Sequence, residues 1–160
     1  MLRKFAFALT AAGILLSGAL IASQSQAQAP SASPGPTFRQ VDDPAVFKDF
    51  GEKAGLVRLM DDFMVNLLAD PRTRTHFEKV DQKRVKEQLV DQFCEILRGP
   101  CRYGGADMKR IHSGMEVNRE AFNALVESLQ VAMDKNNVPF GSQNKLLAIL
   151  APMHREIVNH

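Results

Sequence analysis

The apolar residues of this chain recur at helical spacing in four long runs. In the first run they stand three, four, seven, eight and eleven positions after Leu56, which places them on one stripe of a helix. The run stops at Asp70 and Pro71, because proline cannot continue the hydrogen-bond ladder of a helix. The pattern therefore predicts a helix that begins near Leu56 and ends at about Ala69.

The second run has its apolar positions within residues 85–97 and carries clear start and stop signals. Asp81 stands before it, and an aspartate at that place can accept a hydrogen bond from the first free backbone N–H groups of a helix. Gly99 and Pro100 follow it and end it. We therefore predict a helix between Asp81 and Gly99.

The third and fourth runs cover residues 122–133 and 146–157. Asn118 is placed to cap the third run, and Pro152 should kink the fourth run or remove one of its backbone hydrogen bonds. Alternation of period two, which a half-buried strand needs, is absent over any useful length. The sequence therefore predicts an all-α fold with no internal repeat.

A short segment between the second and third runs holds the candidate chemistry. Residues 102–106 should form a loop, and a single helical turn from Asp107 to Ser113 should follow and end at Gly114. Met108 and His112 are four residues apart and share one face of that turn. A neutral imidazole is a common iron ligand, although a lone histidine between apolar neighbours is more often a packed, hydrogen-bonded side chain.

The first residues have the pattern of a secretory signal. Two basic residues precede the mostly apolar run 5–22, and a polar stretch of small residues then ends at Ala29. Cleavage is predicted after Ala27 or Ala29, which makes residues 1–29 a signal peptide. The alternative is an uncleaved N-terminal membrane anchor, because the apolar run is long for a signal peptide and just long enough to span a bilayer.

The rest of the chain divides into a flexible linker, residues 30–40, and a globular domain, residues 41–160. The linker prediction rests on a Pro-, Ser-, Gly- and Ala-rich composition. Export predicts a periplasmic or secreted protein, or a membrane-anchored one that faces outside the cytoplasm. In such a compartment Cys94 and Cys101 either form a disulfide or remain two half-buried thiols, and the sequence favours neither.

Composition and charge exclude several classes of function. The net charge is only +2, and no basic cluster interleaves with aromatic residues, so we expect no nucleic-acid partner. The two cysteines do not form the paired Cys-x-x-Cys motifs of a zinc site. The sequence shows no catalytic dyad and no phosphate-binding loop.

Two blocks of the chain resemble the group 1 truncated haemoglobins. Residues 63–72, FMVNLLADPR, are similar to the second helix of that family and its exit, and His76-Phe77 resembles the paired aromatic position that follows. Residues 99–112, GPCRYGGADMKRIH, resemble its most recognisable block: a Gly-Pro turn, a Tyr-x-Gly, then a methionine and an iron-binding histidine four apart. The resemblance extends over residues 47–158.

The resemblance implies a truncated globin, a two-over-two helical sandwich around haem b, with His112 as the proximal ligand of the iron. It also implies that Phe77 packs on the haem face, that Tyr103 lies near the haem edge and that Lys109 can pair with a propionate. The implied cofactor-binding residues are Phe63, Met64, Phe77, Val85, Gln88, Leu89, Tyr103, Met108, Lys109 and His112.

The chain departs from the family where bound oxygen would be stabilised. Met64 stands where the family often has a tyrosine, and Leu89 where many members have a glutamine. A hydrogen bond to bound oxygen, which carries partial negative charge, contributes roughly 1.5–3 kcal/mol. Neither residue can donate one, so we expect a mostly apolar distal pocket with fast oxygen loss, in which Gln88 or Gln92 is the remaining donor.

Two further departures affect turns, because Gly51-Glu52 and Arg98-Gly99 stand where the family usually has Gly-Gly. Met64 also suggests an alternative site, in which its thioether is the sixth iron ligand opposite His112.

The signal-like N-terminus and the resemblance together predict an exported haem protein that binds O2, NO or CO and depends on an unidentified reductant. NO dioxygenase or peroxidase-like chemistry is conceivable only as a side activity. The alternatives are a small exported electron-transfer protein with Met64 on the iron, and a haem-free helical interaction module. Membrane contact is expected only if the N-terminal segment is retained.

Overall fold

The structure is a computed structural model that describes residues 36–158, all of which belong to the compact unit 33–160. The predicted signal or anchor, residues 1–29, and the start of the predicted linker lie outside the described residues. Within residues 36–158 the regular structure is helical and no strand occurs, which confirms the all-α prediction. No helix in this part of the chain is long and apolar enough to span a membrane.

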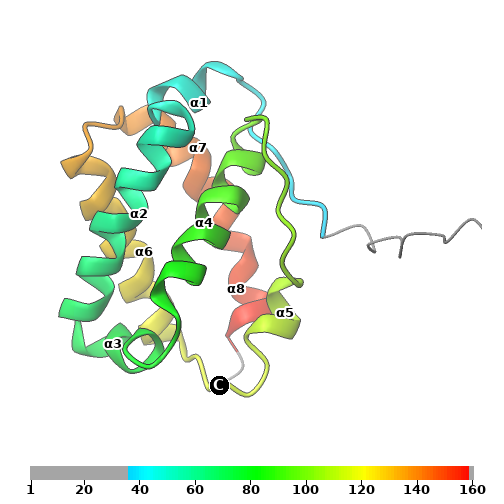
Figure 1. The fold of residues 1–160 in the computed structure, drawn as a ribbon. Coiled ribbons are helices and arrows are strands. Elements are labelled where there is room, and N and C mark those ends of the chain that lie inside the picture. Colours follow the sequence, from blue (N-terminus) through cyan, green and yellow to red (C-terminus); the bar gives the residue numbers. More distant parts are fainter. Residues whose placement is uncertain (1–35, 159–160) are drawn as a thin grey trace, which may run out of the picture. The chain divides into compact units, whose positions relative to one another are not determined.

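The helices follow one another along the chain with short connections, except for a longer loop before α5 (Figure 1). Their bounds are α1 (Ala45–Asp49), α2 (Glu52–Ala69), α3 (Pro71–Phe77), α4 (Gln82–Ile96), α5 (Met108–Ile111), α6 (Arg119–Lys135), α7 (Phe140–Leu150), the 3₁₀ turn η1 (Ala151–Met153) and α8 (His154–Ile157).

The predicted capping residues begin their helices as expected. The side chain of Asp81 accepts a hydrogen bond from the backbone N–H of Arg84 at 3.1 Å, and Asn118 accepts one from Ala121 at 2.8 Å. Each satisfies a backbone donor that has no partner inside the helix. The starts of α4 and α6 are therefore local properties of the sequence.

Two prolines interrupt the helical pattern in different ways. Pro71 ends α2 and also begins α3, where Asp70 caps the new helix by accepting from the N–H of Arg72 at 2.9 Å. Proline suits this first position because its missing N–H would be unpaired there anyway. Pro152 lies in the 3₁₀ turn that separates α7 from α8, which confirms the predicted break in the last helix.

The core lies where α2 packs against both α4 and α6, and α6 packs against α7 (Figure 1). The apolar stripe of α2 supplies many of its residues, as the periodicity predicts. The largest fully buried apolar side chains are Val46, Leu56, Leu59, Met60, Phe63, Leu67, Ile96, Leu97, Leu129, Met133 and Leu146. Sequestering these side chains from water is the main source of stability for such a domain.

Residues 38–41 pack against this helical core. The ring of Phe38 lies edge-on to Tyr103 with centroids 5.2 Å apart, and the backbone N–H of Val41 donates to the carbonyl of Ile96 at 2.9 Å. The last residues of the segment that composition assigns to the linker therefore contact the folded domain.

Candidate functional site

His112 stands immediately after the single turn of α5, and a hydrogen bond to the backbone carbonyl of Met108 orients its ring. Asp107 caps that turn by accepting from the N–H of Arg110 at 2.9 Å. The Nδ1 atom of His112 lies 2.8 Å from the carbonyl oxygen of Met108. A carbonyl oxygen only accepts hydrogen bonds, so Nδ1 is the protonated nitrogen. In the neutral imidazole the lone pair is therefore on Nε2, the arrangement that a metal-binding histidine needs.

His112 lines a small apolar cavity of about 160 Å³. The cavity lies among residues of α3, the start of α4, the segment 111–117, α6 and α8. Its lining residues are mostly aliphatic or aromatic: Thr73, His76, Phe77, Val80, Val85, Ile111, His112, Met115, Val117, Ala121, Phe122, Leu125 and Ile157.

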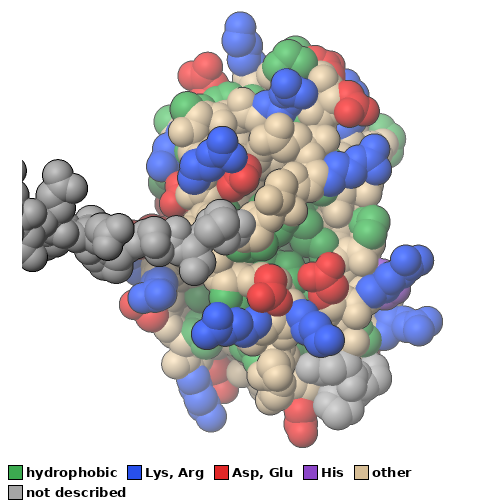
Figure 2. Space-filling model, turned by 90° about the vertical axis from the view of Figure 1, so that its right-hand side faces the viewer, with side chains coloured by type: hydrophobic (Ala, Val, Ile, Leu, Met, Phe, Trp, Pro, Cys, Tyr) green, Lys and Arg blue, Asp and Glu red, His purple; other side chains and the backbone are tan. Residues whose placement is uncertain are grey.

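A second cavity of about 400 Å³ adjoins the first. It lies between α4 and the segment 103–112, and is lined by Phe77, Arg84, Val85, Gln88, Leu89, Gln92, Tyr103, Gly105, Ala106, Met108, Ile111, His112 and Leu125. The two cavities share Phe77, Val85, Ile111, His112 and Leu125. The histidine thus stands where the two cavities meet. On the side of the molecule that carries α5, hydrophobic side chains are visible between charged ones (Figure 2).

Seven of the ten residues predicted to bind the cofactor line the second cavity: Phe77, Val85, Gln88, Leu89, Tyr103, Met108 and His112. They come from α3, from one face of α4 and from the segment 103–112. Residues far apart in the sequence are therefore gathered around His112.

The other three lie elsewhere. Phe63 is 2% exposed and belongs to the hydrophobic core, Met64 is 4% exposed on α2, and Lys109 is exposed on α5. None of them lines either of the two cavities at His112. Their roles at the cofactor stay predictions.

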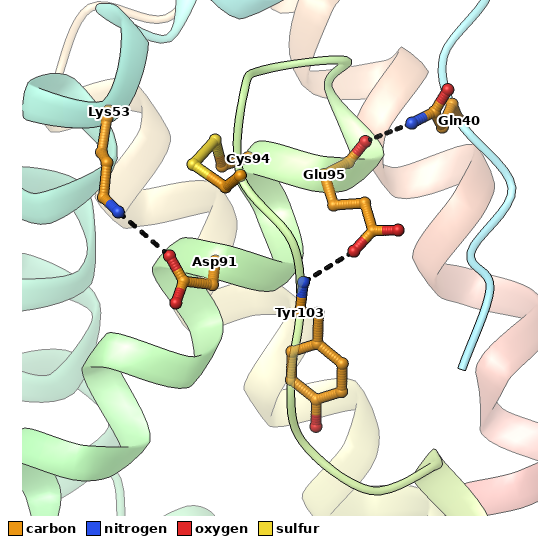
Figure 3. The surroundings of a disulfide bond; sticks show 7 residues. Gln40, Lys53, Asp91, Cys94, Glu95 and Tyr103 are labelled. Carbon is orange, nitrogen blue, oxygen red and sulfur yellow. Dashed lines mark hydrogen bonds and ion pairs between the residues drawn. A yellow bond between two sulfur atoms is a disulfide. The ribbon is translucent and has the colours of Figure 1, made fainter. Parts of the chain in front are cut away.

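A buried carboxylate on α4 positions the loop that leads to His112 (Figure 3). Glu95 accepts a hydrogen bond from the backbone N–H of Tyr103 at 2.7 Å and one from Arg102 Nη1 at 3.4 Å. Gln40 donates to the backbone carbonyl of Glu95 at 2.9 Å. On the other side of α4, Lys53 of α2 pairs with Asp91 at 3.1 Å.

Next to Glu95, Cys94 and Cys101 form a disulfide, with their Cα atoms 5.7 Å apart. This answers the question that the sequence left open. The bridge forms because α4 ends at Ile96 and the chain turns back at Gly99. A Cβ atom on Gly99 would lie 2.6 Å from both Cys94 Sγ and the ring of Phe47, so only glycine fits this turn.

Gly105 allows the loop to lie close to α4. A Cβ atom there would approach Tyr103 Oη to 2.3 Å and Gln88 Oε1 to 2.6 Å. The hydroxyl of Tyr103 donates to the carbonyl of Ala106 at 3.0 Å. Burial raises the pKa of this phenol above its usual value of 10, and the negative charge of Asp107 adds to the increase.

Sequence reasoning did not include several cavity residues among the site residues, notably His76, Ile111, Met115, Phe122 and Leu125. Phe122 and Leu125 belong to the apolar stripe of the third run, and a stripe does not reveal which of its residues face a cavity. For His76 the only signal in the sequence is its place beside Phe77 in the paired aromatic position.

Comparisons with known proteins find relatives over most of this chain. Residues 45–159 match the family model described as bacterial-like globin. A group 1 truncated hemoglobin from Mycolicibacterium paratuberculosis is 28% identical over 120 residues, which cover 75% of this chain and 88% of the relative. A group 1 truncated hemoglobin from Tetrahymena thermophila is 28% identical over 95 residues, which cover 59% of this chain and 78% of the relative.

Solved structures show the same fold. Truncated hemoglobin from Tetrahymena pyriformis in its Fe(III) form matches with a TM-score of 0.68 and 22% identity, over 72% of this chain and 98% of that one. Hemoglobin from Chloroflexus aurantiacus matches with a TM-score of 0.65 and 21% identity, over 74% of this chain and all of that one.

The family match spans most of the chain and coincides with the predicted span, residues 47–158. It includes every helix of the structure and both cavities at His112. The resemblance to group 1 truncated haemoglobins is thereby confirmed. The chain belongs to the bacterial-like globin family, and its cofactor is haem.

Proposed function

We propose that His112 binds the haem iron through Nε2 and that the protein reversibly holds a diatomic gas on the opposite side of the haem. The observation that carries this proposal is the hydrogen bond from Nδ1 of His112 to the Met108 carbonyl, 2.8 Å long. This bond sets the tautomer and the ring orientation before the cofactor arrives. A hydrogen bond from Nδ1 of this kind also makes an imidazole a stronger metal ligand.

The residues around His112 suit haem. Phe77, Val85 and Leu125 line both cavities and present apolar groups that a flat macrocycle can contact. Arg84 lines the second cavity and supplies a cation for a haem propionate. The sequence predicts this role for Lys109, but Lys109 does not line the second cavity. A charge-assisted pair of this kind would fix the edge of the group.

Bound haem supplies an iron that takes up gases such as O2, NO or CO. The residues of this chain hold the cofactor and limit the access of water to it. Val85 and Leu89 on α4 contribute aliphatic surface to the second cavity. Met64 lines neither cavity, so no contact in the structure favours the electron-transfer alternative in which its thioether binds iron.

We also propose that the protein acts outside the cytoplasm. Two features support this: the signal-like pattern of residues 1–29 and the disulfide between Cys94 and Cys101. Disulfides persist in oxidising compartments and are rare in the cytosol. N-terminal sequencing of the protein from a periplasmic or culture fraction tests the proposal, and an intact Met1 in the cytosolic fraction would contradict it.

The function is tested by replacing the proposed ligand. The full chain should be expressed, supplied with haemin and examined by ferric, ferrous and CO-bound absorption spectra. His112→Ala should lose specific haem uptake, because the iron then has no proximal imidazole. His154→Ala is the matched control, since His154 is exposed on α8 and should retain uptake. Uptake by His112→Ala equal to that of the unaltered protein would refute the role of His112.

A further inference from the structure

Residues 38–41, which we call the N-terminal strap, contact the end of α4 and complete its hydrogen bonds. The last carbonyl groups of a helix have no N–H partner inside that helix. The backbone N–H of Val41 donates to the carbonyl of Ile96, the last residue of α4, at 2.9 Å. The side-chain amide of Gln40 donates to the carbonyl of Glu95 at 2.9 Å (Figure 3). Because Val41 is also only 3% exposed, the strap belongs to the folded domain.

The strap also contacts the loop that forms one wall of the second cavity. The ring of Phe38 packs edge-on against the ring of Tyr103, with centroids 5.2 Å apart. Tyr103 is 5% exposed and lines the second cavity together with His112. Phe38 itself lines neither of the two cavities at His112, so it can act on the site only through the loop.

The loop, residues 102–106, depends on Tyr103 for its position. Within the described part of the chain, no backbone–backbone hydrogen bond joins this loop to the rest of the domain. The N–H of Tyr103 donates to the carboxylate of Glu95, and its hydroxyl donates to the carbonyl of Ala106. Its ring has Phe38 as an aromatic neighbour. The strap therefore supports the residue through which the loop is held against α4.

We propose that the N-terminal strap retains the cofactor, with Phe38 as a positioning residue that holds Tyr103, and with it the loop, in place as a wall of the haem site. The inference rests on the proposed function, since it assumes that haem occupies the cavities at His112. A cofactor between α4 and this loop leaves more easily when the loop moves away. Contact between two aromatic rings changes an equilibrium constant by about twofold to tenfold.

The test measures how fast the haem-loaded full chain loses haem to an excess of an apoglobin acceptor. Phe38→Ala should lose haem about twofold to tenfold faster, because the ring that packs on Tyr103 is removed. Phe38→Tyr keeps an aromatic ring and should lose haem at the rate of the unaltered protein. Phe140→Ala is the matched control, since it removes a ring that is 72% exposed at the start of α7, and it should not change the rate.

Hydrogen exchange of the backbone amides in the haem-loaded proteins gives a readout that a general loss of stability would not reproduce. In Phe38→Ala the amide of Tyr103 should exchange faster, because the loop opens locally, while the amides of α2 and α6 should exchange as in the unaltered protein. Equally faster exchange in α2, α6 and the loop would show that Phe38 only stabilises the domain as a whole, which would overturn the inference.

The possible failures are distinguishable. An unchanged rate of haem loss in Phe38→Ala would overturn the inference, whatever the exchange of the Tyr103 amide, and would leave the proposed function standing. Faster haem loss in Phe38→Tyr, equal to that in Phe38→Ala, would show that the ring contact is not the cause. Haem uptake by His112→Ala equal to that of the unaltered protein would instead overturn the proposed function on which the inference rests.

Discussion

Within residues 36–158 four residues other than glycine have a left-handed backbone, and Glu52 and Arg98 are two of them. Glu52 has a φ of 56° and Arg98 a φ of 66°. These are the two places where glycine is usual in the group 1 truncated haemoglobins that the chain resembles. Each turn is thus retained with only one of the two usual glycines, at a steric cost of roughly 1–2 kcal/mol for the residue that replaces the other.

Arg98→Gly should stabilise the folded domain. The strain disappears, while the extra freedom of glycine in the unfolded chain offsets about 0.5–1 kcal/mol of the gain, which leaves a net increase of roughly 0.5–1 kcal/mol. Arg98 is exposed, so the loss of its side chain should cost little. Chemical denaturation measures the change in the free energy of unfolding. Arg98→Ala is the control: it removes the side chain but keeps the strain, and an equal gain there would contradict the explanation.

At the scale of elements, the end of α4 and the segment that follows it form one supporting unit for His112. The disulfide joins Cys94 to Cys101, and Glu95 accepts from the backbone of Tyr103. Both contacts lie before the turn that carries His112. The segment that carries His112 is therefore held by α4, although ten residues lie between His112 and the nearer cysteine, Cys101.

Removal of the disulfide should weaken both the fold and the retention of haem. A bridge that closes a loop this short contributes about 2–3 kcal/mol in the chain-entropy model. The double variant Cys94→Ser, Cys101→Ser should therefore unfold at lower denaturant concentration and lose haem faster to an apoglobin acceptor. Treatment of the unaltered protein with a dithiol should reproduce the effect, and should leave the double variant unchanged. Unchanged haem loss in the variant would show that the bridge does not support His112.

At the scale of the whole molecule, ion pairs connect elements distant in sequence. Asp62 on α2 accepts from Lys135 at 2.7 Å and from Asn136 at 2.8 Å, at the end of α6. Asp43 accepts from Lys145 of α7 at 2.8 Å. In both cases the hydrogen bond from lysine is the main cause that holds the pKa of the aspartate below its usual value of 3.8.

Acid should therefore destabilise the domain in part through Asp62. The pKa of Asp62 is lower in the folded state than in the unfolded chain. Its contribution to the free energy of unfolding is therefore fully present above pH 3.8 and is lost as the pH falls through the lowered pKa. Asp62→Asn should be less stable at neutral pH, by less than about 1 kcal/mol for so accessible a pair. It should also lose less stability than the unaltered protein when acidified. Thermal denaturation across the acid range checks this, with Asp42→Asn at an exposed position as the control. An equal loss of stability on acidification in both variants would contradict the role of Asp62.

The sequence by itself determined the elements whose signals are local. The stripe after Leu56, the caps Asp81 and Asn118 and the break at Pro152 depend on residues a few positions apart, and all four are present in the structure. Helix α3 was not predicted, because seven residues are too few to show a period.

The candidate site was likewise determined in part by the sequence and in part by the tertiary structure. The block 99–112 indicated His112 through a resemblance, and seven of the ten predicted site residues line the cavity beside it. Only the tertiary structure decided that Cys94 and Cys101 are bridged, and that His76 shares a cavity with His112. Caps and stripes are set by neighbours along one helix. A disulfide or a cavity depends on where the chain places segments that are distant in sequence, and that is decided by packing.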